Sequence, residues 1–266
     1  MSGAKTSIEI YSKPQSVDYY ARIEGISACE RSAFDKCLHP GDAVLDVGVG
    51  GGRTTAYLAP KARHYVAVDY CEAMVVAARA KYPQLEFHCA DACDLSFLAD
   101  GSFDVVVFSY NGIDNIPSVA ARLACLREVA RVLKPRGHFV FSSHNAHMTG
   151  FWPVNSQYSE VPGSVSRKLK PPTSARLPTR LVRRLKLPAI RRRAELALRA
   201  LTTKAFYLGH GYIVEAGLWT FTATPQYVSA ELNQAGLQLI ETLGCRYPDK
   251  VPDLLTHYYY YIAVKP

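Results

Sequence analysis

The 266-residue chain has no hydrophobic run that approaches the roughly 20 residues of a membrane-spanning helix. Residues 1–6 are not followed by an apolar stretch of signal-peptide length, so we expect no secretory leader. The seven cysteines are odd in number and scattered through expected helices and strands. This usage favours a reducing, cytoplasmic location over a disulfide framework.

The sequence also lacks the paired spacing of a metal site. Cys89 and Cys93 are separated by three residues, but no second pair of Cys or His completes a zinc-binding set. We therefore predict no metal. Hydrophobic residues still make up 48% of the chain, which is enough for one sizeable core with an inserted subdomain.

A glycine-rich turn lies within residues 44–53, but it lacks one glycine of the dinucleotide-binding motif. Residues 44–53 begin as an apolar strand and continue as a turn with glycines at alternate positions. The dinucleotide fingerprint G-x-G-x-x-G needs a glycine where Arg53 stands. Gly48 and Gly50 let the backbone pass close to a nucleoside. Asp46, two residues before the first glycine, suits a positively charged ligand better than a pyrophosphate.

Three further strand-like runs follow at the intervals of a doubly wound sheet. Residues 65–69 and 85–91 are short runs that end in Asp69 and Asp91. Asp69 lies about one helix and one strand beyond the turn, where an acid meets ribose hydroxyls in such sheets. Residues 103–110 are almost wholly apolar and β-branched, as a strand buried on both faces should be.

The glycine turn, the two acids and the Leu-Lys-Pro-Arg-Gly string at 133–137 together resemble the class I S-adenosylmethionine (SAM)-dependent methyltransferase family. The resemblance is close over residues 40–145 and looser towards the C-terminus. It implies an α/β fold with a Rossmann-like, doubly wound sheet of seven strands in the order 3-2-1-4-5-7-6, strand 7 being antiparallel. Strand five is then expected at 138–142, and the last two strands at 237–243 and 257–264.

The resemblance implies SAM as cofactor and assigns residues to its adenosine part. Asp69 would hold both ribose hydroxyls, and Asp91 would contact the adenine amino group. The backbone of Ala92 would meet the adenine ring, on which Met74 would pack. Taken alone, each acid is an ordinary strand-end residue and Met74 an ordinary core residue, so their joint spacing carries the assignment.

The methionine part of SAM is assigned in the same way. The carbonyl of Tyr110 would meet its amino group. An N-terminal helix, expected after Pro14, would cover SAM and donate Tyr20 or Arg22; the alternative is a plain amphipathic cover helix. The residues of the turn that would line this part are Asp46, Gly48, Gly50 and Gly52.

Positive charge is concentrated in one segment. Residues 167–204 hold thirteen Lys or Arg and a single acid, Glu195, which gives +12, whereas the whole chain carries +8. The other residues are therefore mildly acidic, at −4. We expect 1–147 to form cover helices and the SAM-binding core, 148–217 a basic, partly helical substrate-cover insert after strand five, and 218–266 the strands that complete the sheet.

The insert has the pattern of basic amphipathic helices. Apolar residues recur at helical spacing from Ile190 to Ala205, and arginines lie largely on the other side. Such a segment can cap the domain, close over an acidic small molecule, lie on an anionic membrane surface or grip nucleic acid. Residues 167–204 contain no aromatic residue to stack on bases, which makes nucleic acid the weaker choice.

Methyl transfer needs an aligned nucleophile and, for a hydroxyl acceptor, a base. His144 stands where strand five ends, at the sheet edge where ligands bind, and is the first candidate for that base. Asp114, in the segment 109–115 after strand four, and His210 are weaker candidates. The alternative for each is a structural hydrogen bond.

The sequence thus predicts a cytoplasmic SAM-dependent methyltransferase, with possible peripheral membrane contact through 167–204. The expected acceptor is an oxygen or nitrogen of a small molecule, such as a secondary metabolite, a glycan or a lipid-linked compound. Two alternatives stay open. One is an RNA methyltransferase that binds backbone with the insert, and the other is a SAM-binding partner subunit without activity. The acceptor itself and the oligomeric state cannot be read from the sequence.

Overall fold

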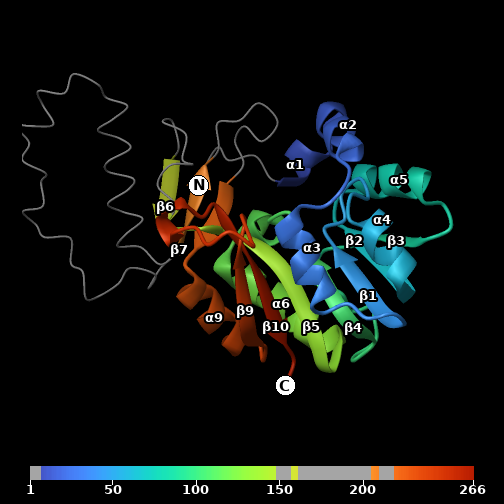
Figure 1. The fold of residues 1–266 in the computed structure, drawn as a ribbon. Coiled ribbons are helices and arrows are strands. Elements are labelled where there is room, and N and C mark those ends of the chain that lie inside the picture. Colours follow the sequence, from blue (N-terminus) through green and yellow to red (C-terminus); the bar gives the residue numbers. More distant parts are fainter. Residues whose placement is uncertain (1–6, 148–156, 161–204, 210–218) are drawn as a thin grey trace, which may run out of the picture.

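One mixed β-sheet forms the centre of the computed structural model, which describes residues 7–147, 157–160, 205–209 and 219–266 (Figure 1). The strands are β1 (Asp42–Val47), β2 (Ala62–Asp69), β3 (Glu86–Cys89), β4 (Phe103–Phe108), β5 (Leu133–Asn145), β6 (Gln157–Glu160), β7 (Ala205–Gly209), β8 (Trp219–Ala223), β9 (Gln238–Gly244) and β10 (Tyr258–Val264). The α-helices are α1 (Ser7–Tyr11), α2 (Pro14–Arg22), α3 (Ala28–Asp35), α4 (Thr55–Leu58), α5 (Glu72–Lys81), α6 (Val119–Val132) and α9 (Pro225–Gln234). Short 3₁₀ helices are η1 (Ala59–Lys61), η2 (Gly112–Asn115) and η3 (Asp253–Leu255).

The strand order confirms the predicted fold class. β3, β2, β1, β4 and β5 are parallel neighbours in that order. β10 runs antiparallel between β5 and β9. With β9 and β10 counted as strands six and seven, this is the doubly wound order 3-2-1-4-5-7-6 with an antiparallel seventh strand.

The sheet differs from the prediction by three additional strands within the described residues. β8 pairs in parallel with the last two residues of β5, and β7 and β6 follow by antiparallel pairing. β4 pairs with β5 only as far as Phe141, so β8 occupies the same edge beside His144 and Asn145. β8 lies in the segment 218–266, which was expected to hold strands that complete the sheet. Ala205, expected as the last apolar position of a helix, instead begins β7 and pairs with Ala223.

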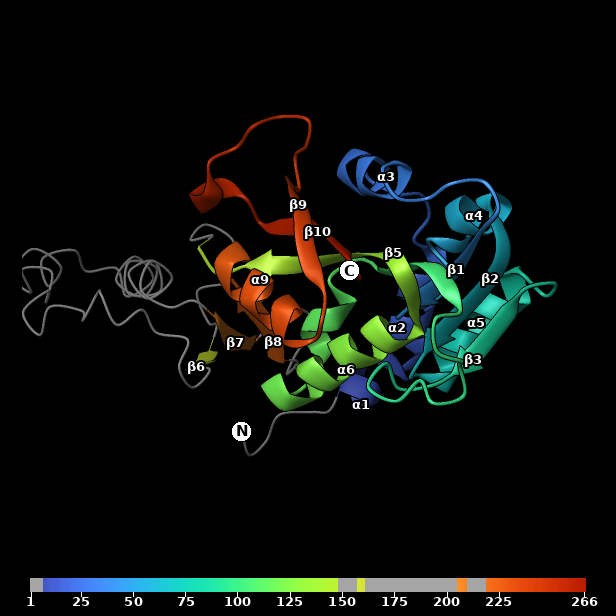
Figure 2. The same cartoon turned by 90° about the horizontal axis from the view of Figure 1, so that it is seen from below.

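Alternate side chains of the strands pack into two cores, one on each face of the sheet. Leu45 and Val106 belong to the core beneath α6 and α9, whereas Val44 and Val105 belong to the core beneath α3, α4 and α5. Figure 2 shows α3 and α4 on one side of the sheet and α6 and α9 on the other. The near-continuous apolar runs of β1 and β4 follow from burial on both faces.

Several local features can be read from the structure. Thr224 caps α9, since its hydroxyl accepts the N–H of Tyr227 at 3.3 Å. β5 begins at Leu133, earlier than expected, because Leu133 already pairs with Phe103 of β4. Phe221 and Thr220, adjacent residues of β8, face opposite ways. Phe221 is fully buried and packs against Arg122, and Thr220 faces the cavity described below.

The N-terminal helices rest on the glycine turn. A Cβ atom on Gly51 would lie 2.5 Å from Cα of Ala21 and 2.9 Å from the carbonyl oxygen of Tyr20 in α2. α2 also packs beside α5, where the ammonium of Lys81 donates to the carbonyl oxygen of Ala21. Within the described residues, no helix is long and apolar enough to cross a membrane.

We expect Gly51→Ala to displace α2 from the turn, because the new methyl group would meet backbone atoms that cannot yield. Hydrogen exchange of residues 14–22 should become faster while exchange in β1 and β4 stays slow. Gly244→Ala is the matched control, because a Cβ there meets its nearest neighbour, Thr256, at an ordinary 3.4 Å. Unchanged exchange in α2 would contradict the contact.

Candidate active site

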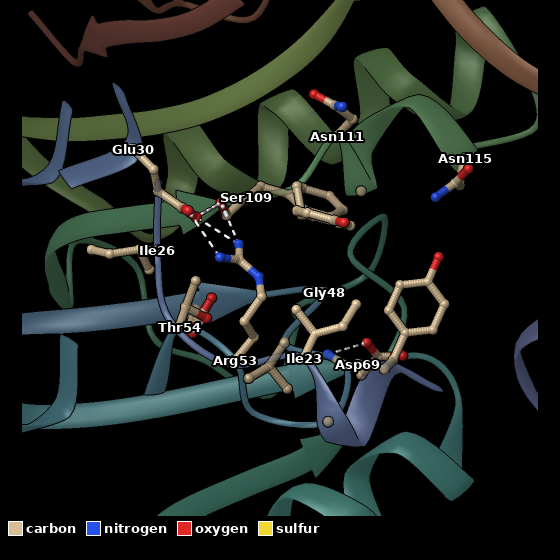
Figure 3. Close-up of a pocket in the computed structure, with 18 of the residues that line it drawn as sticks. Ile23, Ile26, Glu30, Gly48, Arg53, Thr54, Asp69, Ser109, Asn111 and Asn115 are labelled. Carbon is tan, nitrogen blue, oxygen red and sulfur yellow. Dashed lines mark hydrogen bonds and ion pairs between the residues drawn. The ribbon is translucent and has the colours of Figure 1, made fainter. Parts of the chain in front are cut away.

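A cavity of about 710 Å³ lies beyond the carboxyl ends of β1, β2, β4 and β5. This is the point where the strand order reverses, because β2 and β4 lie on opposite sides of β1. Its wall comprises the glycine turn, the ends of β2, β4 and β5, and residues of the N-terminal helices. Figure 3 shows Asp69 on one side of the cavity and Asn111 and Asn115 on another.

Asp69 is held at the end of β2 by two backbone N–H groups. Its Oδ2 accepts from Gly50 and its Oδ1 from Cys71, both at 2.9 Å. Burial raises the pKa of the Asp69 carboxyl, and these two hydrogen bonds oppose that rise. Each oxygen keeps a second acceptor site. The side chain is therefore fixed in place and can still receive two hydroxyl groups.

Each glycine of the turn is required at its position for a different physical reason. Gly48 lines the cavity at φ +64°, and a Cβ there would lie 2.5 Å from the ring of Phe108. Gly50, at φ +53°, faces open space in the cavity wall. Gly52 does not line the cavity; a Cβ there would meet the ring of Tyr82 at 2.9 Å. Only Gly50 therefore keeps space free for a ligand directly.

Asp46 lies at the base of the cavity and is 1% exposed. Its Oδ2 accepts from the hydroxyls of Thr54 at 2.5 Å and Tyr65 at 2.8 Å. Burial raises the pKa of the Asp46 carboxyl to about 6, against the opposing effect of these two hydrogen bonds. A nearby cation would favour the ionised form.

Sequence reasoning missed a buried ion pair on one side of the cavity. The guanidinium of Arg53 binds both oxygens of Glu30, at 2.6 and 2.8 Å, and contacts the hydroxyl of Ser109 at 3.2 Å (Figure 3). Glu30 also forms a capping box with Ser27 at the start of α3. The Ser-x-x-Glu spacing is a readable signal for that cap, but not for its partner Arg53.

The chain turns sharply where β4 ends. Tyr110 and Asn111 have φ of 55° and 57°, in the left-handed region that non-glycine residues rarely adopt. The Asn111 N–H donates to the hydroxyl of Ser142 at 2.8 Å, and the guanidinium carbon of Arg53 lies 4.8 Å from the centre of the Tyr110 ring. Such strain, about 1–3 kcal/mol per residue, is typical of functional sites.

The other predicted cofactor residues divide into two groups. Met74 and Tyr20 line the cavity, and the Tyr20 ring packs edge-on against Tyr11. Arg22 does not reach the cavity, because its exposed side chain pairs with Asp18 at 2.7 Å. The remaining residues outside the lining are Gly52, Asp91 and Ala92. Asp91 is exposed, and its Oδ1 accepts the N–H of Cys93.

His144 and Asp114, predicted separately, are in contact. Nδ1 of His144 lies 2.8 Å from Oδ2 of Asp114, and Nε2 lies 3.3 Å from the amide nitrogen of Asn111. Both contacts fit a proton on Nδ1 and a lone pair on Nε2. His144 lines the cavity, whereas Asp114 is fully buried behind it.

Two remaining predictions concern His210 and metal binding. His210 and the basic residues 167–204 lie outside the described residues. Among the residues that the structure does describe, no group of three or more His, Cys, Asp or Glu side chains is placed to hold a metal ion.

The fold and the position of the cavity are those of a class I SAM-dependent methyltransferase. Residues 45–141 match the family described as Methyltransferase domain. The chain is also similar to the demethylmenaquinone methyltransferases of Beutenbergia cavernae (40% identity over 102 residues; 38% of this chain and 40% of the relative) and Corynebacterium urealyticum (37% over 122 residues; 46% and 50%). The chain thus spans about half the length, or less, of these curated relatives.

Solved structures share the fold at low sequence identity. The CcbJ methyltransferase from Streptomyces caelestis matches with a TM-score of 0.60 and 19% identity, over 93% of this chain and 94% of that chain. The 1,6-didemethyltoxoflavin-N1-methyltransferase from Burkholderia thailandensis, solved with S-adenosylhomocysteine, matches with a TM-score of 0.56 and 16% identity, over 97% and 86%. Residues 45–141 therefore form a methyltransferase domain, and the predicted class I SAM-dependent family and its cofactor SAM are confirmed.

The raised pKa of Asp46 predicts pH-dependent cofactor binding. A cationic ligand binds the ionised carboxylate better, so SAM affinity should rise by about tenfold from pH 5 to 7 and level off above the pKa of about 6. Calorimetric titration with SAM across this range measures the slope. Asp46→Asn should flatten it, and the exposed control Asp91→Asn should keep it. An equally steep slope in Asp46→Asn would remove Asp46 from the cation site.

Proposed function

We propose that this protein transfers the methyl group of SAM to an oxygen or nitrogen of a small-molecule acceptor. One observation carries the proposal: a single cavity joins Asp69 and the glycine turn with Nε2 of His144. The first group is suited to the cofactor, and the second to a proton on the acceptor. A SAM-binding partner without activity has no evident use for the second group.

The chain's own residues would divide the work as follows. Bound SAM supplies an activated methyl group, so the protein contributes alignment and removal of a proton. His144 would accept the acceptor's proton at Nε2, while Asp114 keeps the other ring proton on Nδ1. The amide of Asn111 lies 3.3 Å from Nε2 and would give up this contact when the acceptor donates there.

Two observations support a small acceptor. The cavity of about 710 Å³ has the size of sites for small molecules, roughly 300–1,000 Å³. The named relatives act on compounds of that class, demethylmenaquinone and 1,6-didemethyltoxoflavin. The match to the family ends at residue 141, before His144. The acceptor side of the cavity therefore lies beyond the residues matched to the family.

The acceptor class is tested with methyl-labelled SAM and extract from the source organism. After incubation with purified protein, label should appear in the small-solute or organic fraction. Label in nucleic acid would overturn the proposal in favour of an RNA methyltransferase, and binding should then weaken steeply with salt. Bound SAM without transfer to any fraction would favour the inactive-partner alternative.

Asp69→Ala should weaken SAM binding at least tenfold, since the ribose hydroxyls would lose charge-assisted hydrogen bonds worth ~1.5–3 kcal/mol each. Calorimetry measures the change, and circular dichroism confirms the fold. Asp91→Ala is an informative companion. The family resemblance places Asp91 on adenine, whereas its side chain lies outside the cavity lining. Unchanged affinity in Asp69→Ala would exclude Asp69 from the cofactor site.

His144→Ala should lower turnover by roughly 10²–10⁴-fold and leave SAM affinity nearly intact, because a general base acts on the acceptor. His147→Ala is the matched control: His147 follows closely along the chain but pairs with Asp253 and does not line the cavity. Full activity of His144→Ala would end its candidacy as the base.

A further inference from the structure

Arg122 lies behind His144 and is fully buried. Its guanidinium donates to Oδ1 of Asp114 at 3.2 Å and to the carbonyl oxygen of Ile113 at 2.8 Å. Its other two nitrogens bind the two oxygens of Glu231 at 3.1 Å each. An arginine side chain stays charged under all ordinary conditions, so its burial requires these anionic partners.

Three elements bring this array together. Arg122 comes from α6, Asp114 from η2 and Glu231 from α9, where Glu231 is only 5% exposed. Phe221 of β8 closes it, with its ring centre 3.9 Å from the guanidinium carbon. Water is therefore largely kept from the charges. In such surroundings charges act on one another more strongly than at the surface.

Asp114 connects the array to the site. Its Oδ1 also accepts from the hydroxyl of Ser143 at 2.6 Å. Its Oδ2 accepts from the backbone N–H and Nδ1 of His144, at 2.7 and 2.8 Å. These contacts use all four acceptor positions of an ionised carboxylate. With both acids ionised, the array holds two negative charges and one positive charge, which a proton on His144 would balance.

We propose that Glu231 and Arg122 are positioning residues that set the proton affinity of His144 through Asp114. The inference rests on the proposed role of His144 as base. Arg122 fixes Asp114 in place, and Glu231 cancels the charge of Arg122. Asp114 thereby acts on the imidazole as an uncompensated anion. Without Glu231, Arg122 would neutralise Asp114 and weaken the base.

Other groups near His144 leave this interpretation intact. His257 lies nearby, and burial, Arg246 and His144 lower its pKa, so its titration has to be resolved separately. Tyr258, paired with His144 across the sheet, has its pKa raised to about 12 by burial. Burial likewise keeps Tyr261, close to Asp114, neutral at physiological pH. On the cavity side, Glu30 and Arg53 cancel each other.

The test is Glu231→Gln, which removes one charge and keeps the shape. Nuclear magnetic resonance can follow the imidazole of His144 from pH 5 to 9, with its signal assigned by His144→Asn. The titration midpoint should fall by about one pH unit, because the charge of Arg122 would then offset that of Asp114, which contacts the imidazole. If an acceptor is in hand, the acidic limb of the turnover profile should move to lower pH while the plateau falls.

Two further variants separate charge from structure. Glu241→Gln removes the same charge from an exposed pair with Lys36 and should leave the midpoint unchanged. The double variant Arg122→Gln/Glu231→Gln leaves Asp114 uncompensated again, so the midpoint should return to the wild-type value or above it. If Glu231 had only a structural role, the double variant would be less stable and its midpoint would not return to the wild-type value.

An unchanged midpoint in folded Glu231→Gln would overturn the inference, as would a double variant whose midpoint stays low. The titration midpoints of both variants are measured without any acceptor. Failure of the methyl-transfer assay would therefore count against the proposed function, and not against this electrostatic link.

Discussion

The cavity depends first on the buried ion pair between Arg53 and Glu30. Arg53 belongs to the glycine turn, and Glu30 to α3 of the N-terminal cover. The hydroxyl of Ser109, at the end of β4, joins both. One pair thus ties the turn, the cover and the strand next to β1. Losing either partner would leave a buried charge uncompensated, which costs about 3–5 kcal/mol.

A second buried acid organises the opposite end in the same way. Asp114 collects hydrogen bonds from Ser143, His144 and Arg122, which come from β5 and α6. In both cases a carboxylate that is nearly removed from water fixes neighbouring segments that the backbone ladder of the sheet does not connect. The parallel strands supply a rigid edge, and these acids set the side chains on it. The residues proposed for cofactor and acceptor chemistry are therefore held at one cavity by two separate electrostatic clusters.

The comparisons with known proteins cover the cofactor side of the cavity better than the side at His144. The family match runs from Leu45 in β1 to Phe141 in β5 and includes the glycine turn, Asp69 and the end of β4. His144 and Glu231 lie outside it. The structural neighbours extend further along the chain, but at 14–19% identity they show the fold alone. The residues proposed to act on the acceptor thus lie outside the family match.

The sequence by itself determined where the parallel strands lie, because strands buried on both faces leave continuous apolar runs. Their order came from the resemblance to the methyltransferase family. The sequence also placed Asp46, Asp69, Tyr110 and His144 at strand ends, and those ends meet at one edge. It did not show that Asp114 contacts His144, or that Arg53 pairs with Glu30, because these partners lie 30 and 23 positions apart. Nor did it show that Arg122 is buried between Asp114 and Glu231. Only tertiary packing decides such contacts, since a buried charge takes whichever partner the fold brings within hydrogen-bond reach.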